Sequence, residues 1–390
     1  MASTDGFVGF TSEPSAVDAG TLPAESAEGF TLRMATIENP RKETNQMTSE
    51  YVTIGHPDKI ADYISEYILD RFLEKDPKTR YALEVQIKDN FVSLAGEITS
   101  TVKPKHEDFR QMVVSAVEDI GYTAEYADKW GKGNCIDPRE IEVVEHISIQ
   151  SPDIAQGVDR EGWGDQGIFW GMAVDNPDTN YMPVDHWLAR QIGDTLFKSG
   201  IGGLDIKTQV TMTDGLVESV VVAIPLLETG KEYEAKVAEV VEVVRGIVGP
   251  CEDIIVNGTG KYVCHSSQGD AGTTGRKLAV DFYGGNCRIG GGSPWTKDPT
   301  KADLTLNLYA RRKALDFLRS HGLDECHVQI GCCIGQRDII IQYYDGDMKL
   351  LATQYESKGT SDVIAELNLD RPIYAKLVRT GLPNYIGENR

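Results

Sequence analysis

The sequence predicts an α+β fold of three similar domains in a pseudo-threefold arrangement, each a mixed β-sheet covered by helices on one face. The order helix, hairpin, helix occurs three times along the chain, in units that begin near residues 57, 184 and 303. Apolar residues recur at helical spacing in the helical segments and alternate with polar residues in the hairpin strands. A sheet and an amphipathic helix each bury one apolar face. We therefore expect the two helices of every unit to pack on its sheet and form a hydrophobic core.

Length and composition indicate a globular protein with more than one core. A chain of 390 residues is expected to form two or three domains. The net charge of −21 argues against binding to nucleic acid or a membrane surface, because phosphate-rich surfaces would repel the chain. No apolar run reaches the roughly 18 residues of a membrane span. Seven cysteines without a CxxC pair or a His/Cys ligand spacing suggest reduced thiols, so we expect a cytoplasmic protein.

Residues 1–46 are expected to form a disordered or loosely packed N-terminal tail. Ser, Thr, Ala, Gly, Pro and acidic residues dominate this segment, and no apolar periodicity is sustained in it. The domains predicted after the tail are an N-terminal α+β domain, a gating loop with a central α+β domain, and a C-terminal α+β domain with a glycine-rich loop. Their predicted boundaries are 47–155, 156–263 and 264–390.

The first unit opens with Gly-His-Pro-Asp-Lys at residues 55–59. Pro57 suits the first position of a helix, and an apolar stripe continues the helix to about residue 73. The stripe consists of Ile60, Ile64, Ile68 and Phe72. Unpaired N–H groups at a helix start favour anions, so His56 and Lys59 could hold phosphate while Asp58 holds a metal. The alternative is that these residues only cap the helix, and for this motif alone we prefer capping.

The same patterns place the remaining elements of the three units. Further helices are predicted over residues 105–121, 184–199, 230–248, 303–320 and 360–367. Strands are predicted over residues 80–88, 91–101, 206–224 and 326–344, with hairpin turns at Asp89-Asn90 and Asp214-Gly215. Apolar residues expected on the uncovered faces predict that the sheets pack on one another or on a partner subunit. They are Val220, Val222, Ile339 and Ile340.

A glycine-rich stretch over residues 269–303 carries the strongest local signal. Five cations lie among its glycines although the chain as a whole is acidic: Arg276, Lys277, Arg288, Lys297 and Lys301. Glycine lets a ligand approach the backbone, Arg and Lys bind phosphate oxygens, and an aspartate at the end could hold a divalent ion. We therefore prefer a phosphate-binding loop to the alternative of a flexible, solvated loop. Residues 150–171, also rich in glycine, form either a mobile loop or a plain connector.

Six motifs together point to a known family. They read TSEYVTIGHPDKIAD from Thr48, AGEIT from Ala95, QSPDIAQGVD from Gln150, GDQG from Gly164, DIKTQVT from Asp205, and GDAGTTGRK…DFYGG…GGG…KDPTKAD from Gly269. In order and spacing they resemble the methionine adenosyltransferase (S-adenosylmethionine synthetase) family over about residues 47–345. Any one motif would be weak evidence, whereas the six together are highly specific.

The resemblance implies an enzyme that makes S-adenosylmethionine from ATP and L-methionine and cleaves the displaced triphosphate to pyrophosphate and phosphate. It implies Mg²⁺ and K⁺ as cofactors, and a homodimer or dimer of dimers with active sites between subunits. The sequence has neither a GxSxG motif nor a Walker A motif. This agrees with the implied reaction, because a thioether sulfur has no proton to lose and an anionic leaving group needs cations.

The resemblance also implies roles for individual residues. The catalytic set would be His56, near the 5′ carbon of ATP, and the phosphate-binding Lys207, Arg276, Lys277 and Lys297. Asp58 and Asp303 would hold Mg²⁺, and Glu84 would hold K⁺. The further ATP contacts would be Asp205, Lys261, Tyr262, Asp270 and Ser293. The methionine contacts would be Glu97, Gln156, Asp165, Asp270 and Lys301.

Several positions depart from the family pattern. Residues 290–299 read GGGSPWTKDP where the family has GGGAFSGKDP, so Pro294 could redirect the loop. Lys261 and Tyr262 replace an Arg-Phe pair, the loop over 157–164 is short, and the usual C-terminal ending is missing. These departures leave two alternatives open. One is a non-catalytic or regulatory relative, and the other is an enzyme that acts on another thioether or only hydrolyses triphosphate.

Overall fold

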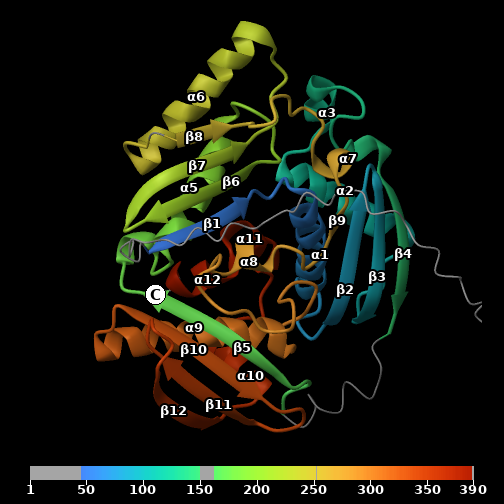
Figure 1. The fold of residues 1–390 in the computed structure, drawn as a ribbon. Helices are drawn as coiled ribbons and strands as arrows, with labels where there is room; N and C mark the ends of the chain where they lie inside the picture. The colour runs from blue at the N-terminus through green and yellow to red at the C-terminus, as the bar shows by residue number, and fades with distance from the viewer. Residues whose placement is uncertain (1–44, 150–161, 252, 389–390) are drawn as a thin grey trace, which may run out of the picture. The chain divides into compact units, whose positions relative to one another are not determined.

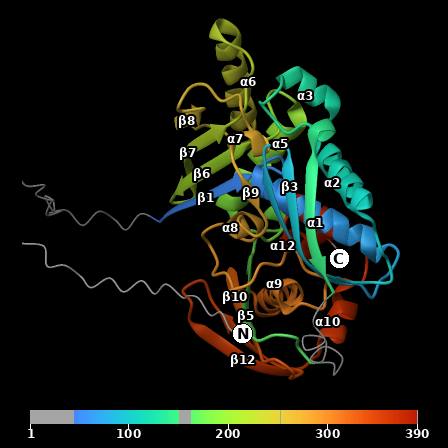
Figure 2. The same ribbon diagram turned by 90° about the vertical axis from the view of Figure 1, so that its right-hand side faces the viewer.

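The computed structural model describes residues 45–149, 162–251 and 253–388. Nearly all of the predicted tail, Gln156 and most of the predicted gating loop lie outside these ranges. Residues Thr44–Arg390 form one compact unit, and the fold described below belongs to it. Its strands make three four-stranded sheets (Figures 1 and 2).

The first sheet has the strand order β4-β3-β2-β9. Its elements and the two helices on it are α1 (Pro57–Leu73), β2 (Arg80–Lys88), β3 (Phe91–Thr99), α2 (His106–Ile120), β4 (Glu142–Ser148) and β9 (Gly272–Thr273). β2 and β3 form the predicted hairpin, and β4 lies parallel to β3. α1 packs on β2 and α2 packs on β4.

The second sheet has the order β1-β6-β7-β8. Its strands and helices are β1 (Gln46–Val52), α5 (Val184–Ser199), β6 (Lys207–Thr213), β7 (Leu216–Ala223), α6 (Gly230–Val248) and β8 (Asp253–Val256). β6 and β7 form the predicted hairpin at Asp214-Gly215. α5 packs on β1 and β6, and α6 packs on β8.

The third sheet has the order β12-β11-β10-β5. Its strands and helices are β5 (Gly167–Val174), α9 (Ala302–His321), β10 (Glu325–Cys332), β11 (Asp338–Tyr344), β12 (Leu350–Ser357) and α10 (Thr360–Leu367). α9 packs on β5 and β10, and α10 packs on α9. All three strand pairings are antiparallel, so the prediction of mixed sheets holds for the first two sheets and is corrected for this one.

Short elements connect the sheets. The helices among them are α3 (Ala124–Trp130), α7 (Ser266–Gly269), α8 (Leu278–Asp281), α11 (Tyr374–Thr380) and α12 (Leu382–Glu388), with 3₁₀ turns at Pro138–Glu140 and Pro177–Thr179. α1 also contacts α11 and β9, and Figure 1 shows it among these connecting elements. In the described ranges no helix combines the length and apolarity needed to cross a membrane.

The predicted α+β class with three units is confirmed, and the sheets add a feature that the sequence did not predict. Each sheet takes one strand from a distant segment: β9 joins the first, β1 the second and β5 the third. Each sheet therefore contains strands from more than one of the predicted domains 47–155, 156–263 and 264–390. The domain boundaries themselves stay a prediction. Val220, Val222 and Ile339 lie in the helix-covered cores and not on open faces, and only Ile340 keeps the predicted orientation.

Candidate active site

The start of α1 positions the first group of predicted site residues. His56 is the N-cap of the helix, and its Nδ1 accepts a hydrogen bond from the N–H of Asp58 at 3.1 Å. Pro57 occupies the first helical position, where its fixed φ is already helical. His56 can therefore cap the helix and also contact a ligand, because capping uses only Nδ1 and leaves Nε2 available.

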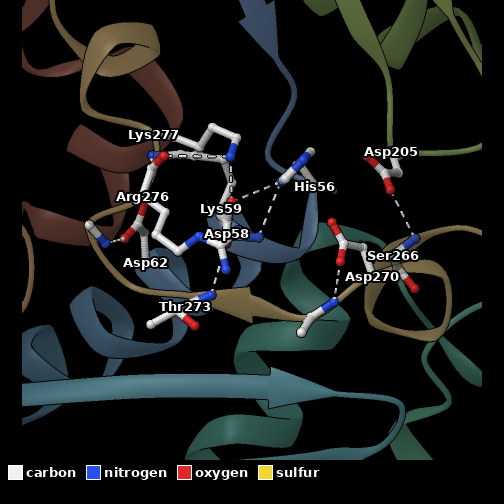
Figure 3. Close-up of polar contacts among 12 residues, drawn as sticks. His56, Asp58, Lys59, Asp62, Asp205, Ser266, Asp270, Thr273, Arg276 and Lys277 are labelled. Carbon is white, nitrogen blue, oxygen red and sulfur yellow. Dashed lines mark hydrogen bonds and ion pairs between the residues drawn. The ribbon is translucent and has the colours of Figure 1, made fainter. Parts of the chain in front are cut away.

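Asp58 lies at the centre of a cationic group (Figure 3). Its carboxylate forms ion pairs with Lys277 and, at 3.5 Å, with Arg276, and it accepts the N–H of Thr273 at 2.9 Å. The side chain is 1% exposed. Burial alone would raise the pKa of Asp58, but the hydrogen bonds from Lys277 and Thr273 lower it below its usual value. The predicted metal ligand is thus held as a carboxylate beside two of the predicted phosphate-binding cations.

His56 is a neutral imidazole in this environment. Burial, together with the charges of Lys207 and Lys277, lowers the pKa of His56 to about 3. Because Nδ1 accepts a hydrogen bond, the ring proton belongs on Nε2. His56 can therefore donate a hydrogen bond to an anionic oxygen at neutral pH without carrying a charge itself.

A cavity of about 520 Å³ opens beside His56. Six of the predicted ATP contacts line it: His56, Asp205, Lys207, Lys261, Tyr262 and Asp270. Figure 3 shows His56 between the Asp58 group on one side and Asp205 and Asp270 on the other. The volume lies in the range of about 300–1,000 Å³ that is usual for small-molecule sites.

Backbone and aromatic contacts hold the wall of this cavity. The hydroxyl of Tyr262 donates to the backbone carbonyl of Asp205 at 3.1 Å, and the Asp205 carboxylate accepts the N–H of Ser266 at 3.0 Å. Burial raises the pKa of Asp205 to about 6. His265, which also lines the cavity, contacts the hydroxyl of Tyr126 at 2.8 Å and was not predicted from the sequence.

The altered loop at residues 293–297 is largely buried. Trp295 is 0% exposed, and its Nε1 donates to Asp281 at 2.7 Å. Thr296 has a φ of +73°, a conformation that a β-branched residue rarely adopts. Its N–H donates to Glu66 at 2.5 Å and its hydroxyl donates to Glu84 at 3.1 Å. Thr296 therefore lies in a strained turn that Glu66 and Glu84 anchor.

A second group of predicted residues surrounds the start of α9. Lys297 pairs with Asp303 at 2.5 Å, and Lys301 pairs with Asp298 at 3.3 Å. This group adjoins the loop of Arg276, because a Cβ built on Gly275 would lie 3.1 Å from the hydroxyl of Ser293. The predicted metal ligands Asp58 and Asp303 thus each pair with a predicted phosphate-binding lysine.

Among the described residues, the other predicted ones form no side-chain hydrogen bond or ion pair with these cations, although Glu84 and Glu97 lie beside the segments that carry them. Glu97 lies on β3 opposite Ala82, which forms an isolated bridge with Lys297. Asp165 precedes β5, and its carbonyl accepts from the thiol of Cys332 at 3.4 Å. Glu84 is exposed and accepts hydrogen bonds from the hydroxyl groups of Thr296 and Thr274. Within the described ranges, no group of three or more His, Cys, Asp and Glu side chains is arranged to hold a metal ion on its own.

Comparisons with known proteins show the family of the chain. The model of the S-adenosylmethionine synthetase N-terminal domain matches residues 44–152, and that of the C-terminal domain matches residues 264–386. The S-adenosylmethionine synthases of Wolinella succinogenes and Helicobacter hepaticus are each 36% identical to the chain. The alignments cover 86% of this chain and 91% of the relative for the first, and 87% and 93% for the second.

A solved structure extends the similarity to three dimensions. An unusual S-adenosylmethionine synthetase from Campylobacter jejuni aligns with a TM-score of 0.76 and 30% sequence identity, covering 87% of this chain and 96% of that one. Both terminal family models, the two relatives and the solved structure therefore indicate the same family. The chain belongs to the S-adenosylmethionine synthetase family.

Proposed function

We propose that the chain makes S-adenosylmethionine from ATP and L-methionine, with the displaced triphosphate cleaved to pyrophosphate and phosphate. One observation carries the proposal: a neutral His56 stands between an ATP-sized cavity and a group of cations gathered on Asp58. The adenosine part of ATP would occupy the cavity, and the triphosphate would extend past His56 toward Arg276 and Lys277.

The chemistry asks for charge stabilisation at the leaving group. The thioether sulfur attacks the 5′ carbon with a lone pair, the bond from that carbon to the triphosphate oxygen breaks, and no proton is transferred. Preorganised donors near the departing oxygen then lower the barrier. His56 supplies such a donor at Nε2, and Lys207, Arg276, Lys277 and Lys297 supply positive charge along the phosphates. A histidine with a pKa of about 3 is unsuited to act as a base at neutral pH, and this reaction requires none.

Asp58 and Asp303 suit Mg²⁺. Each carboxylate now pairs with a lysine that would turn to a phosphate when ATP binds, which frees carboxylate oxygens of the type that Mg²⁺ prefers. Room for the Asp303 carboxylate depends on Gly292, since a Cβ there would lie 2.0 Å from its Oδ1. Bound Mg²⁺ would neutralise part of the developing phosphate charge.

Glu84 could hold K⁺ through its carboxylate oxygens. One carboxylate oxygen accepts the hydroxyl of Thr296 and the other accepts the hydroxyl of Thr274. Each oxygen keeps a second lone pair, so the carboxylate could accept these hydroxyls and also hold a cation. Glu84 therefore fits the K⁺ role that the resemblance implies, and Thr296, which stands where the family pattern has glycine, adds a hydroxyl beside it.

The methionine side of the site is proposed to lie between two copies of the chain. Glu97, Gln156, Asp165, Asp270 and Lys301 are the proposed methionine contacts. Large apolar side chains are exposed on the strands of all three sheets, among them Phe91, Val144, Ile168, Leu216 and Tyr355. Covering such residues favours association through the open sheet faces. A homodimer or dimer of dimers would let one copy bring Glu97 and Asp165 to the cations of the other.

Turnover by two variants tests the proposal. His56→Ala and Lys207→Ala are expected to reduce S-adenosylmethionine formation at least about a hundredfold, because each removes a charge-stabilising contact to the leaving group. Circular dichroism and the thermal midpoint check that each variant is folded. If either variant kept full turnover, the assignment of these residues to the triphosphate would be wrong.

A further inference from the structure

Four carboxylates form a buried column along α1. Asp58, Asp62, Glu66 and Asp70 recur every four residues, a spacing that places them on one face of the helix. Their exposures are only 1%, 0%, 0% and 4%. Burying a carboxylate is unfavourable unless it accepts strong hydrogen bonds. The proposed reaction uses only Asp58, so the other three need a separate explanation.

Each carboxylate in the column accepts main-chain N–H groups from the C-terminal half of the chain. Asp58 accepts from Thr273 at 2.9 Å, Asp62 from Gly275 at 2.8 Å, Glu66 from Thr296 at 2.5 Å, and Asp70 from Tyr374 and Ala375 at 2.9 Å each. Ordered along the helix, these bonds fix the loop of Arg276 and Lys277, then the turn before Lys297, then the start of α11. The first three anchors thus hold the two segments that carry phosphate-binding cations.

A buried lysine ties the two segments to each other. Lys59 donates to Asp62 at 3.1 Å and to Asp281 at 2.6 Å. Asp281 also accepts from Nε1 of Trp295, and the Lys59 ammonium lies 5.0 Å from the centre of that ring. One lysine cannot neutralise both carboxylates, so burial together with Asp281 raises the pKa of Asp62 to about 7.

We infer that Asp62 is a positioning residue for the triphosphate site, holding the main chain at Gly275 so that Arg276 and Lys277 project toward the phosphates. Glu66 has the same relation to Lys297 through Thr296. Asp70 likewise accepts main-chain N–H groups, from Tyr374 and Ala375, but it anchors α11, which carries none of the proposed site residues. The inference rests on the proposed function, because it assigns the positioned cations to the triphosphate.

Asp70 supplies a matched control for Asp62. Each carboxylate is buried and accepts one hydrogen bond on each oxygen. An Asn at either position replaces one accepting oxygen by an NH₂ group, so one of the two hydrogen bonds is lost and two donors face each other. Wild type, Asp62→Asn and Asp70→Asn are compared for binding of inorganic tripolyphosphate by calorimetry, with thermal midpoints measured alongside. Both variants are expected to lose thermal stability. Only Asp62→Asn is expected to weaken tripolyphosphate binding, by about tenfold, whereas Asp70→Asn stays within about twofold of wild type.

A second variant keeps the test decisive if Asp62→Asn fails to fold. Trp295→Phe retains a ring over Lys59 and removes the donor to Asp281, and we expect it to weaken tripolyphosphate binding about threefold. Equal binding by wild type, Asp62→Asn and Trp295→Phe would overturn the inference and leave the proposed function standing. Equal weakening by Asp62→Asn and Asp70→Asn would overturn it too, by showing a merely structural role. A folded wild type that does not bind tripolyphosphate would instead overturn the proposed function and, with it, the inference.

Discussion

Replacement of Thr296 measures the strain in the turn that contains it. At a φ of +73°, a residue with a Cβ costs about 1–2 kcal/mol relative to its ordinary conformations, whereas glycine adopts this φ freely. Thr296→Ala and Thr296→Gly both lose the methyl group and the 3.1 Å hydrogen bond to Glu84, and both keep the N–H bond to Glu66. The difference between the two variants therefore isolates the backbone conformation.

The magnitude follows from two opposing contributions. Glycine relieves about 1–2 kcal/mol of strain and loses about 0.5–1 kcal/mol through the greater freedom of the unfolded chain. The midpoints of the two ranges differ by about 0.75 kcal/mol, so Thr296→Gly should be more stable than Thr296→Ala by about that amount, the reverse of the usual order of these residues. The free energy of unfolding is measured by urea denaturation at one fixed protein concentration, since association would otherwise shift it. An alanine variant as stable as the glycine variant would refute the reasoning.

Three further predictions concern ions and protonation. Replacing K⁺ by tetramethylammonium should lower kcat/KM about tenfold, because each Glu84 oxygen keeps a lone pair for the cation beside the hydroxyl that it accepts, and an unchanged kcat/KM would contradict this role of Glu84. In a pH titration followed by NMR, the His56 imidazole should stay neutral down to at least pH 5, and a midpoint near 6.5 would contradict the assigned environment. The unfolded chain takes up this proton near pH 6.5 and the folded chain only near pH 3, so the contribution of His56 to stability is complete above pH 6.5 and declines as the pH falls. Asp303→Asn should raise the Mg²⁺ concentration for half-maximal activity roughly tenfold, and an unchanged Mg²⁺ dependence would remove Asp303 from the metal site.

The parts of the fold that local sequence signals determine were predictable. Pro57 and an apolar stripe at helical spacing marked α1, and alternation around Asp89-Asn90 marked the first hairpin. The strands that join a sheet from a distant segment, β1, β5 and β9, were not predicted. Each pairs with a strand far along the chain, and local sequence patterns do not indicate such a partner. The uncovered faces were misjudged for Val220, Val222 and Ile339, since alternation separates two faces without showing which one the helices cover.

In the candidate site, too, the residues with a local sequence signal were predicted and the others were not. Motifs indicated His56, Asp58 and the cations of the glycine-rich loop, and the structure brings two of these cations, Arg276 and Lys277, to Asp58 beside His56. The column of Asp62, Glu66 and Asp70 was missed, because acids at four-residue spacing are also what a solvated helix face would show. In the structure these carboxylates are buried, and main-chain N–H groups from distant segments donate to them. The sequence alone does not show these contacts. The position of Gln156 stays a prediction, since it lies outside the described residues.

The reaction products of the purified protein test the central claim most directly. The protein is incubated with ATP, L-methionine and Mg²⁺, and S-adenosylmethionine, pyrophosphate and phosphate are measured together by mass spectrometry, with and without methionine. We predict equal amounts of all three products, formed only when methionine is present, because the sulfur must displace the triphosphate before it is cleaved. Phosphate released without S-adenosylmethionine, or no product from a folded protein that still binds ATP, would contradict the account.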